Sequence, residues 1–174
     1  LPIDESNLSR AVQLCSKTNQ LNLRAIRHKE VDLLSLIKPN KEFCFLVKLE
    51  DIYGDHGIVG LVCLVEINES CVFVDTFLMR CRVLGRHLES WMLNEAMIVS
   101  KNHGYKYIVG QFLQTEKNKV CEDFYQINGF KDISEDTKNI DIIKFSKITG
   151  KEGLFYMEIG TSTLPFIEVF NEEL

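Results

Sequence analysis

Three apolar segments follow one another in the middle of the chain, and they constrain its fold more than any other feature. Residues 43–49, 57–65 and 71–79 are rich in Phe, Val, Ile and Leu, as buried β-strands usually are. The short connections at residues 53–57 and 68–70 contain Gly, Asn and Ser, which permit tight reversals. The sequence therefore predicts three consecutive antiparallel strands.

Two helical patterns precede these strands. Residues 6–17 carry apolar residues on one helical face, with Ser6 as the predicted N-cap. Residues 29–37 form a second predicted helix, which ends before Pro39 because the residue preceding a proline is disfavoured in the helical region. Between the two helices, residues 20–23 are predicted to be extended.

A further alternation of helices and strands follows. Residues 85–100 have apolar residues at three- and four-residue spacing, and Gly104 stands where a helix terminator is expected. The remaining predicted elements are a strand at residues 105–112, a helix at residues 119–127 with Val120, Phe124 and Ile127 on its buried face, and strands at residues 140–145 and 154–159. This order predicts an α+β domain with a mixed, mostly antiparallel sheet flanked by helices.

The length and composition fit one globular domain. At 174 residues, of which 45% are apolar and 26% charged, the chain is long enough for a substantial core. A single domain over residues 1–174 is predicted. Because the sequence opens on Leu1 without an initiator methionine, we expect it to be a fragment of a longer chain.

Charge and cysteine content exclude several function classes. The formal net charge of −5 argues against a nucleic-acid partner, which usually needs a basic face. No apolar stretch approaches the roughly 20 residues needed to cross a bilayer, so no membrane association is expected. The six cysteines form no C-x-x-C pair and show no metal-ligand spacing with the four histidines, so no metal is predicted. They are interpreted as reduced thiols of a cytoplasmic protein.

The densest positive charge lies between the third strand and the helix that follows it. Residues 80–87 contain three arginines and one histidine but no acid. Free backbone N–H groups at the start of a helix, together with its partial positive charge, favour an anion. Gly85 would let the backbone approach a phosphate, and Arg82 or Arg86 would neutralise its charge. These residues predict a phosphate site; the alternative is a solvated basic turn whose glycine serves only the geometry.

The order of strand, basic turn, long helix, strand and second helix resembles the GNAT acyltransferase fold. That family's turn is written Q/R-x-x-G-x-G/A, and Arg82 and Gly85 match it. His87 stands where the family has a small residue. Its side chain would either crowd a diphosphate or add a cationic contact.

A second motif adds to this resemblance. The run Phe124-Tyr125-x-x-x-Gly129-Phe130 is similar to the F-Y-x-x-x-G-F run of GNAT domains, and Asn118 precedes it where many members place an asparagine. The resemblance implies that Tyr125 lies near the thioester sulfur and protonates the leaving thiolate, as a phenol with a pKa of about 10 can do. The alternative is a tyrosine that packs one end in the core.

The general base is marked less clearly. Asp75 interrupts an apolar strand, where an acid is costly unless it is paired or exposed, and it is the candidate. Glu66 lies at the end of the preceding strand, and Asp55 and His56 in the first connection are alternatives. A carboxylate on the solvent side of the strand would have no catalytic role.

A closer resemblance extends from residue 13 to about residue 130. Its main runs are Gln13-x-x-x-x-Thr18-Asn19-Gln20-x-Asn22-Leu23, residues 53–60 and residues 75–86, and they are similar to the C-terminal region of FkbH-type proteins. That family joins an N-terminal haloacid-dehalogenase-like domain to a C-terminal GNAT-like domain. The resemblance implies loading of a glyceryl unit from a phosphorylated three-carbon donor onto an acyl carrier protein, in polyketide-type pathways such as methoxymalonyl extender synthesis. No D-x-D-x-[TV] phosphatase signature occurs here, so the phosphate chemistry is expected upstream of Leu1.

Two functions follow from these resemblances. In the first, the domain transfers an acyl group held as a phosphopantetheine thioester by acetyl-CoA or by an acyl carrier protein. The arm would pair with the backbone at the end of the third strand, and its phosphate would lie on the basic turn. The predicted binding residues are Leu78, Met79, Arg80, Arg82, Val83, Leu84, Gly85, Arg86, His87 and Asn118, and the predicted catalytic residues are Asp75 and Tyr125. In the second function, the domain only docks the carrier protein for an upstream dehalogenase-like domain.

Overall fold

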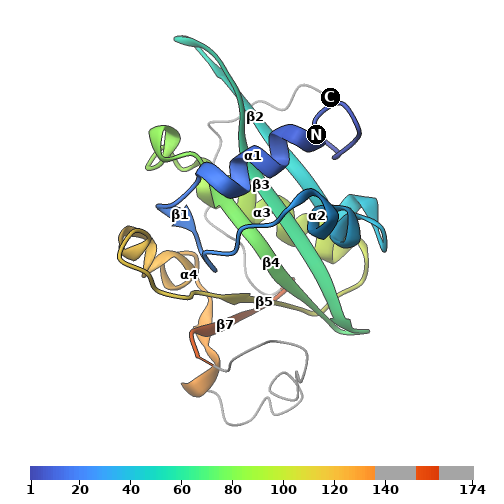
Figure 1. Cartoon of the computed structure of the whole chain (residues 1–174). Coiled ribbons are helices and arrows are strands. Elements are labelled where there is room, and N and C mark those ends of the chain that lie inside the picture. Colours follow the sequence, from blue (N-terminus) through green and yellow to red (C-terminus); the bar gives the residue numbers. More distant parts are fainter. Residues whose placement is uncertain (136–151, 161–174) are drawn as a thin grey trace.

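A computed structural model of the chain describes residues 1–135 and 152–160. They form a seven-stranded sheet in the order β2-β3-β4-β5-β7-β6, with β1 paired to β4 off this path (Figure 1). The strands are β1 (Leu21–Asn22), β2 (Cys44–Asp51), β3 (Gly54–Asn68), β4 (Cys71–Met79), β5 (Tyr107–Gln111), β6 (Lys131–Asp132) and β7 (Leu154–Glu158). The helices are α1 (Leu8–Lys17), α2 (Glu30–Ile37), α3 (Leu88–Asn102) and α4 (Phe124–Ile127). The β4–β5 pair is parallel and its neighbours are antiparallel, so the predicted α+β class with a mixed sheet is confirmed.

Strand alternation divides the apolar residues between the two faces of the sheet. Leu61 of β3 packs in a cluster with α1 and α2, whereas Val62, the next residue, packs in a second cluster with α3. Helices α1 and α2 accordingly cross the front of the sheet in Figure 1, and α3 lies behind it. The sheet is therefore the middle layer, buried on both sides.

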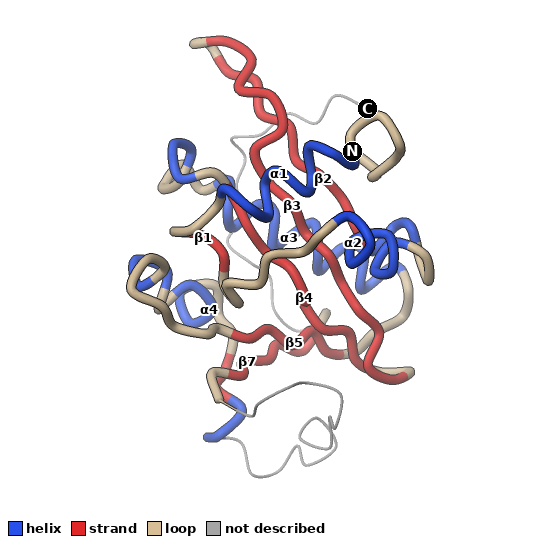
Figure 2. Tube along the Cα trace, in the orientation of Figure 1, coloured by secondary structure: helices blue, strands red, loops and turns tan. Residues whose placement is uncertain are grey.

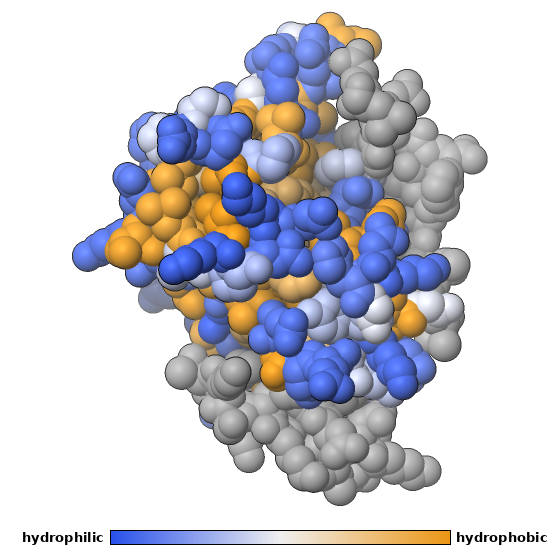
Figure 3. Space-filling model, turned by 90° about the vertical axis from the view of Figure 1, so that its right-hand side faces the viewer, coloured by the Kyte–Doolittle hydropathy of each residue, from blue (hydrophilic) through white to orange (hydrophobic). Residues whose placement is uncertain are grey.

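The predicted meander is confirmed, with longer strands than expected. Strand β2 continues to Asp51 and β3 begins at Gly54, so the connection predicted at residues 53–57 lies largely within β3. The pairing register shifts after Val47 and after Leu49 of β2, where β3 carries one extra residue each time, Val59 and His56. The hairpin extends beyond the sheet, and its tip residue Ile52 is 92% exposed. In Figure 3, this tip lies at the top of a face on which hydrophilic residues in the centre adjoin hydrophobic residues on the left.

Two predicted helix starts are wrong. Helix α1 begins at Leu8, and Ser6 does not cap it, because the carboxylate of Asp4 accepts hydrogen bonds from the Ser6 and Asn7 amides at 2.8 and 3.2 Å. Helix α3 begins at Leu88 rather than at residue 85. His87, the residue before it, has a left-handed backbone with φ of 63°, which a regular helix cannot contain.

The helix predicted at residues 119–127 is also wrong. It consists of a 3-10 turn, Lys119–Cys121, followed by the single-turn α4. Val120 and Ile127, predicted to be buried, are 66% and 76% exposed, because the neighbouring aromatic residues Phe124 and Tyr125 fill the core instead. The predictions for β5 and β7 are confirmed, and the strand predicted at residues 140–145 lies outside the described residues.

The feature that positions the candidate site is a divergence of the two parallel strands. Strand β4 pairs with β5 only over Cys71 to Phe73. At its other end β4 pairs with β1, so the connection between α1 and α2 enters the space between β4 and β5 (Figure 2). The end of β4 leads directly into the basic turn.

Candidate active site

The basic turn connects β4 to α3 and is anchored in the core. Val83 is fully buried, and Leu84 packs against the same apolar cluster. Gly85 has φ of 80°, a conformation that favours glycine, and no atom lies near the position that a Cβ would occupy. The anchored backbone therefore presents the Gly85 region to solvent.

The arginines of this turn contact the β2–β3 hairpin. An Arg86 nitrogen, Nη1, lies 2.8 Å from Oδ2 of Asp51, and Arg82 Nη2 donates to the carbonyl oxygen of His56 at 3.0 Å. Although desolvation opposes it, hydrogen bonds from Tyr53 and His56 together with the charge of Arg86 lower the pKa of Asp51. The hairpin therefore contacts one side of the turn.

A carboxylate already occupies part of the predicted anion site. Gly85 N donates to Oε1 of Glu89 at 3.3 Å, one turn into α3. The other oxygen, Oε2, is buried and has no hydrogen-bond partner among the described residues. The Gly85 amide, which was predicted to face a phosphate, thus faces a carboxylate of the same chain, and its role in binding a phosphate stays a prediction.

The predicted backbone positions of β4 are also engaged. Leu78 and Met79 lie opposite Asn22 and Leu21 of β1, and Arg80 N donates to the carbonyl oxygen of Val59 at 2.8 Å. Their role in binding a thioester arm stays a prediction. Binding of the arm there requires that β1 separates from this edge of β4.

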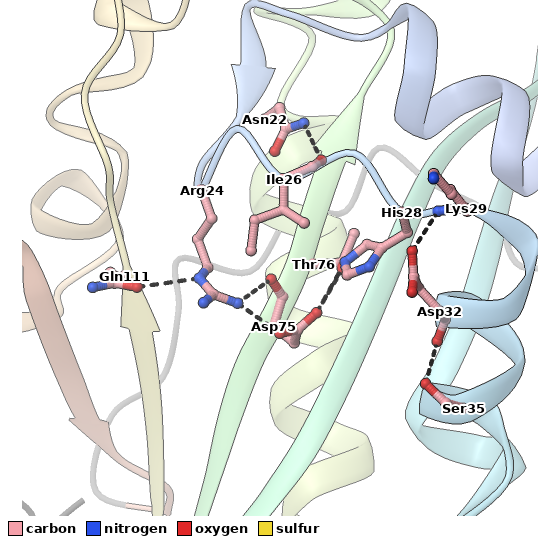
Figure 4. Close-up of polar contacts among 10 residues, drawn as sticks. All are labelled: Asn22, Arg24, Ile26, His28, Lys29, Asp32, Ser35, Asp75, Thr76 and Gln111. Atoms are coloured by element: carbon pink, nitrogen blue, oxygen red, sulfur yellow. Dashed lines mark hydrogen bonds and ion pairs between the residues drawn. The ribbon is translucent and has the colours of Figure 1, made fainter. Parts of the chain in front are cut away.

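Beside β1, a buried ion pair joins the α1–α2 connection to the sheet (Figure 4). Arg24 Nη1 lies 2.6 Å from Oδ1 of Asp75 and 3.0 Å from its carbonyl oxygen. The Arg24 Nε donates to Oε1 of Gln111 on β5 at 3.2 Å, and the guanidinium lies 4.8 Å from the ring centre of Phe73. Only 8% of the Arg24 side chain and 17% of the Asp75 side chain are exposed. Arg24 therefore bridges the two diverging strands.

The second oxygen of Asp75 faces His28 and Thr76. Oδ2 lies 3.1 Å from His28 Nε2 and accepts from the Thr76 hydroxyl at 2.9 Å. The same hydroxyl lies 2.8 Å from His28 Nε2, so it accepts a hydrogen bond there when it donates to Asp75. Nε2 of His28 therefore faces both the carboxylate of Asp75 and the hydroxyl of Thr76.

The surroundings of Asp75 favour its ionised form. Burial alone would raise the pKa of this carboxyl, but the hydrogen bond with His28 and the positive charge of Arg24 outweigh burial and hold the pKa below its usual value. A carboxylate with a low pKa and two occupied oxygens is a weak proton acceptor. These contacts suit a residue that orients the His28 imidazole. The prediction that Asp75 itself is the general base stays a prediction.

Tyr125 lies close to Arg24 and Gln111. It is 1% exposed, and its ring packs among Phe124, Phe130 and Phe155. A Cβ added at Gly110 would lie 2.2 Å from the ring, so β5 needs a glycine there. The hydroxyl is buried and has no hydrogen-bond partner of normal geometry among the described residues. Burial raises the pKa of this phenol, so it stays protonated.

Asn118 is fully buried beside β1. Its Nδ2 donates to the carbonyl oxygens of Asn22 and Leu113, both at 3.0 Å, and its Oδ1 accepts from the Thr115 amide at 2.6 Å. The predicted binding residue Asn118 therefore does lie at the edge of the strand divergence. It is currently saturated by the chain's own backbone.

Sequence reasoning missed four residues that the structure brings together: Arg24, His28, Thr76 and Gln111. The available signal was Asp75, an acid inside an apolar strand that must have a partner. The structure does not bring the alternative bases to Asp75: Glu66 accepts from the Tyr105 hydroxyl at 2.7 Å, Asp55 pairs with Lys48, and His56 with Asp51.

Solved structures of the same architecture include several acetyltransferases. Ard1 from Thermoplasma volcanium superposes with a TM-score of 0.64 at 9% identity, covering 91% of this chain and 95% of that one. A GNAT-family acetyltransferase from Staphylococcus aureus Mu50 has a TM-score of 0.64 at 14% identity, with 91% and 97% covered. Rv2747 from Mycobacterium tuberculosis, solved in complex with CoA, has a TM-score of 0.61 at 13% identity, with 90% and 95% covered.

The chain has the GNAT fold. The predicted fold is thereby confirmed, and at these identities the likeness concerns the fold alone. No protein-family model matches the chain, and no curated protein is significantly similar to it in sequence. The sequence motifs, rather than relatives, therefore carry the assignment of the site.

Neither a membrane helix nor a metal cluster is found in the part of the chain that the structure describes. Within residues 1–135 and 152–160, no helix is both long and apolar enough to cross a bilayer. Across the same residues, no three His, Cys, Asp or Glu side chains are grouped to hold a metal ion.

Proposed function

We propose that this domain binds a phosphopantetheine thioester, carried by coenzyme A or by an acyl carrier protein, and transfers its acyl group. The observation that carries the proposal is the buried hydroxyl of Tyr125, which lies close to Arg24 and Gln111 and has no hydrogen-bond partner of normal geometry within residues 1–135 and 152–160. A buried hydroxyl without a partner costs about 1–3 kcal/mol and calls for an explanation. A ligand group in the divergence supplies one. The CoA bound to Rv2747, a protein of the same fold, supports this ligand class.

The chemistry needs a proton donor and a proton acceptor on opposite sides of the thioester. The acceptor substrate's lone pair attacks the carbonyl carbon, the C–S bond breaks with its electron pair going to sulfur, and Tyr125 gives its proton to the thiolate. His28 Nδ1 takes the proton that the acceptor loses, and Asp75 orients that imidazole from its other side. In the unliganded domain, Arg24 holds Asp75 ionised.

A binding measurement tests the proposal. Calorimetric titration of the domain with acetyl-CoA, and separately with a holo carrier protein, should give saturable binding of at least one of them. A transfer assay with the bound donor should then release free thiol. Absence of binding to either donor would overturn the proposal.

A second candidate function is favoured by one specific observation. The edge of β4 and the Gly85 amide, which the arm needs, are occupied by β1 and by Glu89. A domain that only docks a carrier protein for another active site would keep these contacts. Binding of the holo carrier protein with no binding of acetyl-CoA and no transfer would identify this function.

The biological setting is proposed from the FkbH-type resemblance. The domain would act beside an upstream haloacid-dehalogenase-like domain of the same chain, in loading a glyceryl unit onto an acyl carrier protein for methoxymalonyl extender synthesis. All six cysteines are free thiols, five of them buried, which supports a reducing, cytoplasmic setting. A dehalogenase-type aspartate motif encoded before Leu1 would be consistent with this setting, and a different domain there would contradict it.

Glu89→Gln is expected to strengthen binding of the phosphate-bearing donor by about fivefold to tenfold, since it removes the anion that shares the Gly85 amide. Titration of acetyl-CoA into both proteins measures the change. Glu95→Gln, on the same helix, makes the same charge change away from the turn and should leave the affinity within about twofold. Equal effects of the two substitutions would show that only net charge matters and would remove Gly85 from the binding site.

A further inference from the structure

The segment between α1 and α2 is held like a strand in the space where β4 and β5 diverge. We call residues 20–25, which include β1, the strap. Leu21 lies opposite Met79 and Asn22 opposite Leu78, and Leu23 N donates to the carbonyl oxygen of Phe77 at 3.3 Å. The strap therefore covers the last three residues of β4.

The other edge of the strap is bonded to the continuation of β5. Leu113 N donates to the carbonyl oxygen of Leu23 at 2.8 Å, and Asn118 Nδ2 donates to that of Asn22 at 3.0 Å. Arg24 reaches Gln111 on this side and Asp75 on the other (Figure 4). The strap is thus bonded on both edges, in the manner of an inserted strand.

The positions that the strap fills are those that the proposed function assigns to the thioester arm. Strand addition to a free edge is a common mode of binding, because the edge offers unpaired N–H and C=O groups. Here the strap takes the edge at Leu78 and Met79 and also the amide of Asn118. An arm and the strap cannot occupy this edge together.

We propose that the strap is an intramolecular occupant of the arm groove, and that the donor binds only to molecules in which the strap has left β4. This inference rests on the proposed function. Its consequence is quantitative, because the apparent dissociation constant equals the intrinsic one divided by the fraction of strap-released molecules. The strap would thereby select donors whose partner protein or acyl group helps to displace it.

Two features of the strap favour its release, although Leu21 and Leu23 are buried in the core. Ala25 has φ of 56°, a left-handed conformation that is costly for a residue other than glycine, and release relieves it. A cavity of about 340 Å³ adjoins the strap, and its lining includes Asn22, Ala25 and Thr115. The strap therefore has one open side and stored strain at its end.

A reversible lock tests whether the strap must move. Leu21 and Met79 lie opposite each other and in the same apolar cluster, so Leu21→Cys with Met79→Cys should form a disulfide when oxidised. Titration with acetyl-CoA and with a holo carrier protein is run on the oxidised and the reduced form of this one variant, with the crosslink confirmed by mass. We expect donor binding to be at least tenfold weaker in the oxidised form and to return on reduction.

A loosened strap gives the opposite result. Leu23→Ala removes a side chain that is 1% exposed and should tighten donor binding at least tenfold, since it weakens the strap-bound state. Leu33→Ala on α2, where Leu33 is also fully buried, is the matched control: it should lower the stability to unfolding without tightening binding.

The outcomes separate the two proposals. Equal binding by the oxidised and reduced lock, or equal tightening by Leu23→Ala and Leu33→Ala, would overturn the strap inference and leave the proposed function standing. Absence of binding by the wild type, the reduced lock and Leu23→Ala alike would overturn the proposed function and, with it, the role of the strap.

Discussion

Tyr125→Phe is expected to slow acyl transfer by about 10²–10⁴-fold while leaving donor affinity within a few fold, because the substitution removes only the proton that the leaving thiolate would take. The ring remains to pack among Phe124, Phe130 and Phe155, and the hydroxyl that is lost has no partner of normal geometry among the described residues. Unfolding free energy should therefore be unchanged or slightly higher. Single-turnover thiol release and equilibrium denaturation measure the two quantities.

The control for this experiment is Tyr156→Phe. Tyr156 is 4% exposed on β7 and packs in a separate apolar cluster with Cys71 and Val109. Tyr156→Phe also removes one phenol hydroxyl, but at a position away from the strand divergence. Acyl transfer by this variant should therefore continue at the wild-type rate. An unchanged rate in Tyr125→Phe would end the assignment of this tyrosine as the acid.

Much of the fold could be predicted because its signals are local. The apolar runs at residues 43–49, 57–65 and 71–79 each lie within or close to one strand, and the helical spacing of Leu88, Met92 and Ala96 lies within one helix. The predictions failed where tertiary contacts decide the outcome. Ile127 follows the helical period but is exposed, because α4 is a single turn fixed by its aromatic neighbours.

The site could be predicted only in part, for the same reason. Gly85, Arg82 and Tyr125 belong to short motifs that are legible in the sequence. The Arg24–Asp75 pair could not be predicted from the sequence, because the two residues are 51 positions apart. They meet only because the α1–α2 connection enters the space where β4 and β5 diverge. A sequence pattern likewise does not reveal the contact of the Gly85 amide with Glu89 or the left-handed backbone of His87.

Arg24→Met is expected to lower the free energy of unfolding by about 2–4 kcal/mol, because the buried carboxylate of Asp75 loses the positive charge paired with it. Asp75→Asn should cost a similar amount by leaving the guanidinium unpaired. The double substitution should cost less than the sum, with a coupling of about 1–3 kcal/mol measured by denaturant unfolding. Lys48→Met, which breaks an ion pair whose side chains are 45% and 52% exposed, should cost less than about 1 kcal/mol and serves as the control.

The pH dependence of the same variants separates charge from packing. The pKa of Asp75 is lowered in the folded protein, so its ionised form stabilises the fold fully above its unfolded value of 3.8, and this contribution is lost as the pH falls through the lower folded value. The stability difference between wild type and Asp75→Asn should therefore be constant near neutral pH and shrink in the acid range. A difference that persists unchanged in acid would assign the cost to packing and hydrogen bonding. Arg24 would then hold the strap by its fit between β4 and β5 rather than by its charge.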